Sequence, residues 1–372
     1  MTKDAKRFQY LDGLRGIACM QVVIEHYGGL FTPRFVHHLG FFANGDAAVI
    51  LFFLMSGFVL TKSFEASSIP PAGLALKRVV RLMLPALVAS YLAVPLAWIG
   101  QDAIHRAWVI TGSMIHYAPF SNPIKNLSGV TLLLGYSDTS IFHAPWLGSR
   151  LNCLNSSLWT ISTEIWGSAW ILMLVTVRRR SEIGYRAMLI ASISLIGAND
   201  ISLFTIGSLM TRHTAARPVL GCILIICGLM LWSLPVPDRF FFFLAWFPGL
   251  LYGDEVVKPV LDAGAIAIFC GVLWFHKAQA ALAWRPIKIL GRLSFSIYLI
   301  HWPIMVAVGG AAYLAGRSLG HPGEIAFCTG VAVTIAAAWL FERHVDAPAI
   351  ALSRIIGNSS FSIMPKLSRA PT

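Results

Sequence analysis

The hydrophobic positions along the chain gather into ten runs, separated by short polar or basic segments. A helix needs about 20 mostly apolar residues to cross the hydrocarbon core of a bilayer, and most of the runs approach that length. The pattern therefore predicts an all-α fold, a polytopic membrane bundle of about ten transmembrane helices. The predicted helices are residues 13–31, 47–64, 82–100, 157–177, 185–198, 200–212, 217–234, 259–276, 289–314 and 324–343.

Two parts of this pattern leave alternatives open. The runs 185–198 and 200–212 are short and adjacent, so they form either a tight hairpin or one broken element. The connections 101–156 and 235–258 are long and contain aromatic and turn-forming residues. Connections of this kind are candidates for re-entrant or interfacial segments that line a cavity.

The composition supports a membrane protein. The 372 residues are 56% hydrophobic and 12% charged, whereas soluble domains carry about 25% charged residues. We predict one membrane domain over residues 1–350 and a disordered cytoplasmic tail over residues 351–372. The basic N-terminus resembles a signal peptide, but the first apolar run carries Arg15, Glu25 and His26 and no small-residue cleavage site follows. This run is therefore predicted to be a retained helix.

The basic residues predict the orientation of the chain. If the N-terminus is cytoplasmic and the ten helices alternate, 22 of the 29 Lys and Arg residues fall on the cytoplasmic side. The remaining seven are Arg34, Arg106, Lys125, Arg150, Arg239, Lys258 and Arg317. Cytoplasmic connections of membrane proteins carry an excess of Lys and Arg. The bias therefore predicts an even number of spans with both termini in the cytoplasm.

Charge and cysteine usage exclude two other classes of site. The formal net charge is +12, but the basic residues alternate with apolar runs and are not interleaved with exposed aromatics, so no nucleic-acid partner is predicted. The six cysteines form neither a C-x-x-C pair nor a zinc-binding pattern, so no metal site and no disulfide framework are predicted.

The first run contains a cation and an imidazole on one helical face. Arg15 and His26 are eleven residues apart, close to three full turns. Arg15 would lie at the cytoplasmic edge, where it could bind a phosphate, and His26 would lie deeper, where an imidazole can act as a proton acceptor. The alternative is that Arg15 only reaches the lipid interface and His26 packs between helices.

Arg78 and Arg81 precede the third run with a spacing of three residues. Residues at i and i+3 share a helical face, so the two guanidinium groups could hold phosphates together. Ordinary anchoring at the cytoplasmic surface is the alternative.

Two further ionisable residues lie inside predicted spans. Glu164 is roughly 10 Å below the outer end of its helix, and His301 is roughly 15 Å above the cytoplasmic end of its own. Such residues are costly in a bilayer and mark functional sites by default. A structural hydrogen bond for Glu164 and a packed core position for His301 are the alternatives.

These depths predict a single polar chamber. His26, Glu164 and His301 come from three helices and fall in the central zone. Arg15, Arg78, Arg81 and Arg292 fall at the cytoplasmic edge. This arrangement suits a donor whose phosphates stay at a basic cytoplasmic opening while its reactive end reaches inward.

Six segments, in the same order, resemble the acyltransferase family 3 membrane enzymes, which include O-antigen O-acetyltransferases. They cover nearly the whole chain. The segments are Tyr10–Ala18 with His26, Ala48–Phe58, Arg78-Val-Val-Arg81-Leu, Ser157–Glu164, Phe204–Gly207 and Leu290–Pro303. The chain departs from the family pattern at Ser162-Thr163-Glu164, where the family often has S-V-E.

The resemblance implies a ten-helix acyltransferase domain in the bacterial inner (plasma) membrane, with acetyl-CoA as the usual acyl donor. His26 corresponds to the histidine of the family's basic-x10-His motif and is implied to be the catalytic base. Arg78 and Arg81 correspond to the R-x-x-R motif associated with the CoA end, and Glu164 and His301 occupy further family positions. No extracytoplasmic hydrolase-like domain is expected, so the chain acts alone, with a separate extracytoplasmic partner or as a homo-oligomer. Membrane lipid is a further expected partner.

The expected reaction is transfer of an acyl group, acetyl by resemblance, from cytoplasmic acyl-CoA to a hydroxyl of an envelope or exported glycan or glycolipid. Arg15, Arg78 and Arg81 are expected to hold the CoA phosphates. His26 and Glu164 are expected to act at the thioester, and His301 to shape the chamber or bind the pantetheine arm. The acceptor, the acyl length and the choice between direct transfer and an acyl-enzyme remain open.

Two other function classes compete with this reading. Buried His and Glu residues also build the proton relays of transporters, but the matching broken helices of a repeat-based transporter are not evident. A non-catalytic scaffold does not explain three ionisable groups at one depth.

Overall fold

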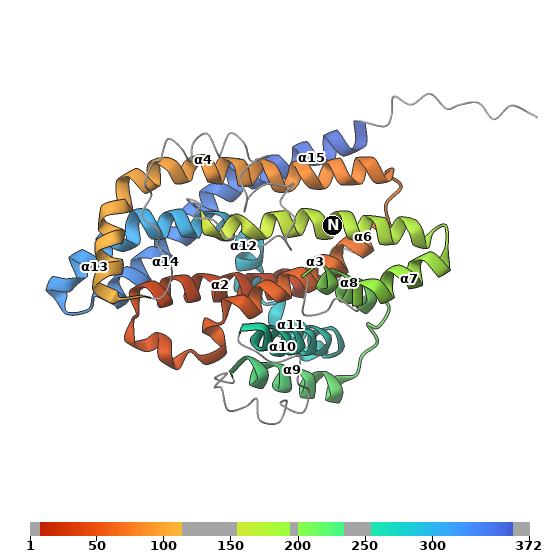
Figure 1. Ribbon diagram of the computed structural model, residues 1–372, viewed down its shortest axis with the longest axis horizontal. Coiled ribbons are helices and arrows are strands. Elements are labelled where there is room, and N and C mark those ends of the chain that lie inside the picture. The colour runs from red at the N-terminus through yellow and green to blue at the C-terminus, as the bar shows by residue number, and fades with distance from the viewer. Residues whose placement is uncertain (1–7, 114–154, 194–199, 234–253, 360–372) are drawn as a thin grey trace, which may run out of the picture.

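The computed structural model describes residues 8–113, 155–193, 200–233 and 254–359, and within these ranges the regular elements are all helical (Figure 1). The all-α prediction is confirmed. The longer helices are α2 (Gln9–Phe31), α3 (Gly45–Glu65), α4 (Pro71–Thr111), α6 (Trp159–Arg178), α7 (Glu182–Ile193), α8 (Ile201–Met210), α9 (Pro218–Ser233), α10 (Asp254–Trp274), α12 (Arg285–Ile304), α14 (Pro322–Phe341) and α15 (Ala347–Ser359).

Each of the ten predicted runs overlaps a helix, but several predicted ends differ. Helix α4 begins at Pro71, well before the predicted start at residue 82. Helix α4 has 41 residues and continues through residues 101–111, which were expected to start an outer loop. No Pro or Gly interrupts that stretch, and the helix ends at Gly112, whose φ of 61° is the left-handed cap that glycine favours. Helix α15 crosses the predicted tail boundary at residue 350 and runs to Ser359.

Within the described residues, five helices are long and apolar enough to cross a membrane. They are Gly45–Glu65, Pro71–Thr111, Trp159–Arg178, Arg285–Leu319 and Pro322–Gly357. A sixth span is possible if the pair Pro259–Trp274 and His276–Leu282, bent by 96°, counts as one. The chain is therefore a multi-pass membrane protein.

Helices α2 and α12 run side by side and parallel at the centre of the bundle (Figure 1). Their contacts keep a constant offset of 275 residues, from Cys19 and Ser294 to His26 and His301. Glycine permits this close approach: a Cβ on Gly16 would lie 2.6 Å from the backbone nitrogen of Gly291.

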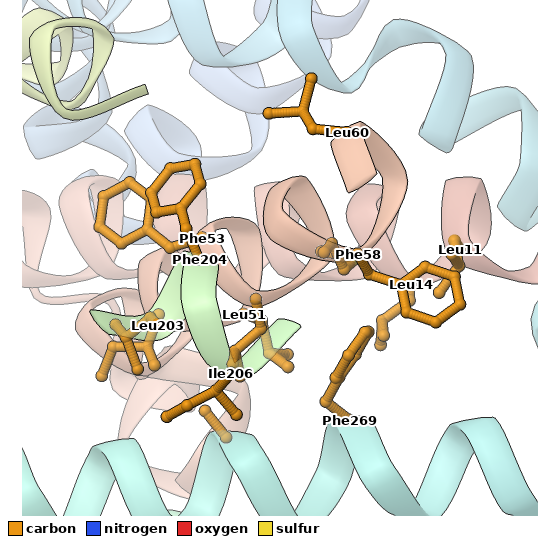
Figure 2. Close-up of a cluster of buried hydrophobic side chains, with 14 of the residues drawn as sticks. Leu11, Leu14, Leu51, Phe53, Phe58, Leu60, Leu203, Phe204, Ile206 and Phe269 are labelled. Atoms are coloured by element: carbon orange, nitrogen blue, oxygen red, sulfur yellow. The ribbon is translucent and has the colours of Figure 1, made fainter. Parts of the chain in front are cut away.

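Helix α3 packs against α8 in the same close manner. A Cβ on Gly57 would lie 2.0 Å from the carbonyl oxygen of Phe204, so only glycine fits, as expected for a close helix contact. Figure 2 shows the apolar cluster around this contact, in which Phe53 stacks on Phe204 with ring centroids 5.4 Å apart and Phe58 meets Phe269 edge to face at 5.8 Å. This packing fixes α3 against α8 and α10.

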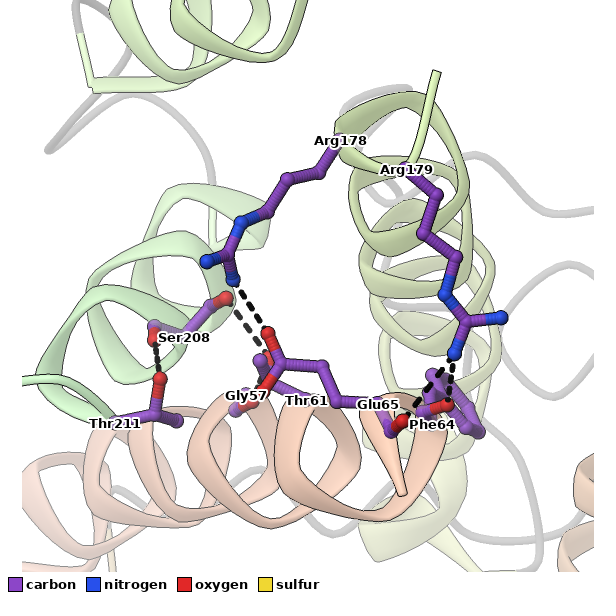
Figure 3. Close-up of polar contacts among 8 residues, drawn as sticks. All are labelled: Gly57, Thr61, Phe64, Glu65, Arg178, Arg179, Ser208 and Thr211. Carbon is purple, nitrogen blue, oxygen red and sulfur yellow. Dashed lines mark hydrogen bonds and ion pairs between the residues drawn. The ribbon is translucent and has the colours of Figure 1, made fainter. Parts of the chain in front are cut away.

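Polar contacts fasten the C-terminal end of α3 to α6 and α8 (Figure 3). The guanidinium of Arg178 lies 2.5 Å from the Glu65 carboxylate, and Arg179 donates to the carbonyl oxygen of Phe64 at 3.1 Å. Thr61 donates to Ser208 on α8 at 2.8 Å. These contacts therefore hold the C-terminal end of α3 against α6 and α8.

Candidate functional site

Two histidines from α2 and α12 form a hydrogen-bonded pair. Nδ1 of His26 lies 2.8 Å from Nε2 of His301, and the rings are nearly parallel, with centroids 5.1 Å apart. Trp302 packs edge-on against the His26 ring at 5.1 Å. His301 is fully buried, whereas His26 is partly exposed. The two imidazoles thus lie side by side at the same level of α2 and α12.

The backbone of α12 anchors His301. Its Nδ1 lies 2.8 Å from the carbonyl oxygen of Tyr298 and 3.2 Å from that of Ile297. Tyr27 strengthens the local packing, because its hydroxyl donates to the carbonyl oxygen of His301 at 3.2 Å and lies 2.9 Å from the Thr334 hydroxyl. The ring of His301 therefore has little freedom to turn.

Glu164 is held in a separate polar network that joins α3, α4 and α6. One carboxylate oxygen contacts Nη2 of Arg78 at 2.5 Å, and the other accepts from the Ser56 hydroxyl at 2.6 Å. Nε of Arg78 donates to the hydroxyl of Ser168 at 2.9 Å. The partners of the Glu164 carboxylate are therefore an arginine and a serine.

A cavity of about 1020 Å³ lies beside this network. Its walls come from α2, α3, α4, α6, α10, α11 (His276–Leu282), α12, the segment Glu342–Asp346 and α15. Its basic lining residues are Arg15, Lys62, Arg78, Arg81, His276, Lys288 and Arg292, and its acidic ones are Asp12, Glu164, Glu342 and Asp346. A cavity of this size is large enough for a cofactor-sized ligand.

The basic side chains of the cavity differ in whether they form ion pairs with acidic residues. Arg78 is paired with Glu164, Arg292 lies 3.4 Å from Glu342, and Arg15 lies 3.3 Å from Asp12 on its own helix. Arg81 has no ion pair within 4 Å in the described part of the chain and is exposed on the cavity wall. It is therefore well placed to meet an anionic ligand.

The structure thus brings four of the six predicted site residues to one cavity and separates the other two from it. Arg15, Arg78, Arg81 and Glu164 line the cavity, whereas neither His26 nor His301 lies on its wall. Arg15 and His26 share a helical face, but α12 covers that face at the level of His26. The structure thus shows a basic cavity and an adjacent histidine pair, and one chamber that contains both the imidazoles and the carboxylate stays a prediction.

Tyr298 connects the two parts. Its side chain lines the cavity, its hydroxyl lies 2.9 Å from that of Thr160, and its carbonyl oxygen contacts His301. Sequence reasoning gave no role to Tyr298 or Ser56. Both residues lie in the segments that carry the family resemblance. Tyr298 is also one helical turn before His301, and this spacing could have indicated that the two residues are neighbours.

The chain matches the acyltransferase 3 family, described as an acyltransferase domain, over residues 8–343. No curated protein and no solved structure gave a match. The matched range contains α2, α12 and every cavity-lining residue except Asp346 and Ile350. With helices long enough to span a membrane and a family match over most of its length, the chain belongs to the acyltransferase 3 family and is a membrane acyltransferase.

Proposed function

We propose that this acyltransferase transfers an acetyl group from cytoplasmic acetyl-CoA to a hydroxyl of an envelope or exported glycan or glycolipid, in the inner membrane. The observation that carries the proposal is the histidine pair beside a cavity rich in cations. The resemblance of the six sequence segments to O-acetyltransferases supports acetyl as the group and a glycan hydroxyl as the acceptor.

The donor would bind with its phosphates against cations on the cavity wall. Arg81 and Arg15 are the proposed phosphate ligands, because guanidinium groups bind phosphate oxygens in two-point contacts. Arg78 would contribute through its charge while its hydrogen bonds keep it on Glu164. The pantetheine arm would then run along the wall formed by Phe52, Thr160 and Tyr298 toward the histidines.

The proposed chemistry is direct transfer with His26 as general base. His26 takes the proton of the acceptor hydroxyl while the hydroxyl oxygen attacks the thioester carbonyl carbon. The carbon–sulfur bond breaks, and the CoA sulfur leaves with the proton that His26 returns. The products are the ester and CoA–SH, so atoms and charge balance.

The proposed topology has ten spans and both termini in the cytoplasm, which opens the basic end of the cavity to the cell interior. The excess of Lys and Arg in the predicted cytoplasmic connections supports this orientation. A cytoplasmic opening gives acetyl-CoA direct access, while an acceptor on the other face would reach the partly exposed His26.

The experiment uses the full-length protein in lipid nanodiscs with radiolabelled acetyl-CoA and envelope glycan from a strain that lacks the protein. Label is expected in the glycan, with one CoA released per acetyl transferred. His26→Gln is expected to reduce the rate by about 10²–10⁴-fold, the usual worth of a general base. Ser192→Ala, which loses one buried hydrogen bond to Thr205 at a position that does not line the cavity, serves as the folding control.

Two results would overturn parts of the proposal. Unchanged transfer by His26→Gln would remove His26 as the base. Failure to transfer from acetyl-CoA together with transfer from longer acyl-CoA donors would replace acetyl as the group and leave the acyltransferase reaction in place.

A further inference from the structure

The hydrogen bonds of His301 show where its proton lies. Its Nδ1 faces two backbone carbonyl oxygens, of Tyr298 and Ile297. A carbonyl oxygen can only accept a hydrogen bond, so Nδ1 of His301 must carry a hydrogen. His301 is fully buried, and a charged imidazolium without a counter-ion is strongly disfavoured in such a place. The neutral ring therefore carries its lone pair on Nε2.

This assignment determines the tautomer of the neighbouring imidazole. Nε2 of His301 lies 2.8 Å from Nδ1 of His26. Because the former accepts, the latter must donate, and a neutral His26 then carries its lone pair on Nε2. The result is a chain of hydrogen bonds: Nδ1 of His26 donates to Nε2 of His301, and Nδ1 of His301 donates to the backbone carbonyl oxygens.

We infer that His301 is a positioning residue that holds His26 in the tautomer whose Nε2 is the proton acceptor in acyl transfer. This inference rests on the proposed function, in which His26 is the base. It replaces the expectation that His301 shapes the chamber or binds the pantetheine arm, because His301 is fully buried and does not line the cavity.

The arrangement also assists the second half of the reaction. When His26 takes a proton on Nε2, both of its nitrogens become donors, and Nδ1 keeps its hydrogen bond to His301. The positive charge is then stabilised by an acceptor that is already in place, and no side chain has to turn during the reaction. Trp302 limits rotation of the ring from its other side.

The test compares His301→Gln with His301→Leu in nanodiscs, with kcat and KM measured for acetyl-CoA. The amide oxygen of glutamine can reach the position of Nε2 and accept from His26, whereas leucine has no acceptor. His301→Leu is expected to lower kcat by about 10²-fold or more, within the range for loss of a base or its correct tautomer. KM for acetyl-CoA is expected to stay within about twofold, and His301→Gln to recover at least tenfold of the lost kcat.

The outcomes separate the competing roles. A raised KM with unchanged kcat in His301→Leu would assign His301 to donor binding and overturn the inference. Equal kcat in the leucine and glutamine variants, with the loss following the amount of folded protein, would make its role structural and overturn it too. His26→Gln, measured in parallel, tests the proposed function separately: if it stays active, the base itself is wrong, whatever His301 does.

Discussion

Glu164 illustrates how far a single residue can be interpreted from sequence. Its depth in a predicted span correctly indicated that it needs a polar partner. The partner could not be predicted, because Arg78 and Ser56 lie on other helices whose rotation depends on packing. In the structure both carboxylate oxygens are engaged, by Arg78 and by Ser56. The residue is therefore better placed to hold helices together and to fix Arg78 than to exchange a proton.

Removing one member of this pair is expected to destabilise the protein. Glu164→Ala leaves the largely buried Arg78 guanidinium without its counter-ion, which typically costs about 3–5 kcal/mol. The double variant Arg78→Met with Glu164→Leu is expected to lose less than Glu164→Ala alone, since no charge is left unpaired. Thermal unfolding in detergent measures both, and a double variant less stable than the single one would contradict this role.

Arg81 is predicted to act on donor binding. Arg81→Ala is expected to raise KM for acetyl-CoA by about tenfold, the loss of one charge-assisted contact of about 1.5 kcal/mol, with kcat changed little. Higher salt should weaken donor binding in the wild type more than in the variant, because part of the attraction is already removed. Arg317→Ala, an exposed cation outside the cavity, is the matched control. Equal KM in the two variants would show that Arg81 does not touch the donor.

At the scale of elements, the helix pattern was predictable and the helix ends were less so. All ten apolar runs became helices because length and hydropathy are local properties. That His26 and His301 lie at the same level of two parallel helices was also predictable, since each position follows from the rise per residue along its helix. Their direct contact was not, because it requires the glycine-mediated approach of α2 and α12 at Gly16 and Gly291.

The close approach of α3 and α8 gives a prediction at this scale. Gly57→Ala places a Cβ against the backbone of Phe204, and overpacking of this kind costs about 1–3 kcal/mol. Gly184→Ala is the matched control, because its Cβ would meet only movable side-chain atoms of Val177 and Ser181 at 3.2 Å or more. The fraction of protein that stays monodisperse on heating in detergent reports both. Equal stability of the two variants would contradict the packing of α3 on α8.

At the scale of the molecule, the sequence predicted the residues of the site but not how all of them are arranged around the cavity. It predicted a polar chamber with a basic opening, and a cavity with that lining exists. It predicted that the chamber also contains the imidazoles; in the structure neither histidine lines this cavity, and Tyr298 lies between the cavity and His301. The shape of the wall depends on how several helices pack together, which no single helical pattern encodes. Most of the connections 101–156 and 235–258, which were predicted as candidates to line a cavity, lies outside the described residues, namely residues 114–154 and 235–253.

The orientation of the whole molecule is the remaining prediction at this scale. A fluorescent protein fused to the C-terminus is expected to be bright and an alkaline phosphatase fused there to be inactive, since both termini are predicted to be cytoplasmic. A fusion of each reporter after Ser113, on the predicted outer side, should give the opposite pair of results. An active phosphatase at the C-terminus would reverse the orientation and put the basic opening on the wrong face for CoA.

The central claim is that an acyl-CoA held by the cavity cations presents its thioester to His26. An electron cryo-microscopy map of the nanodisc-embedded protein with a non-hydrolysable thioether analogue of acetyl-CoA tests it most directly. The account predicts CoA phosphates in contact with Arg15 or Arg81, and the carbon that stands for the thioester carbonyl near Nε2 of His26. Phosphates bound elsewhere, or an acyl end directed away from the histidine pair, would contradict it.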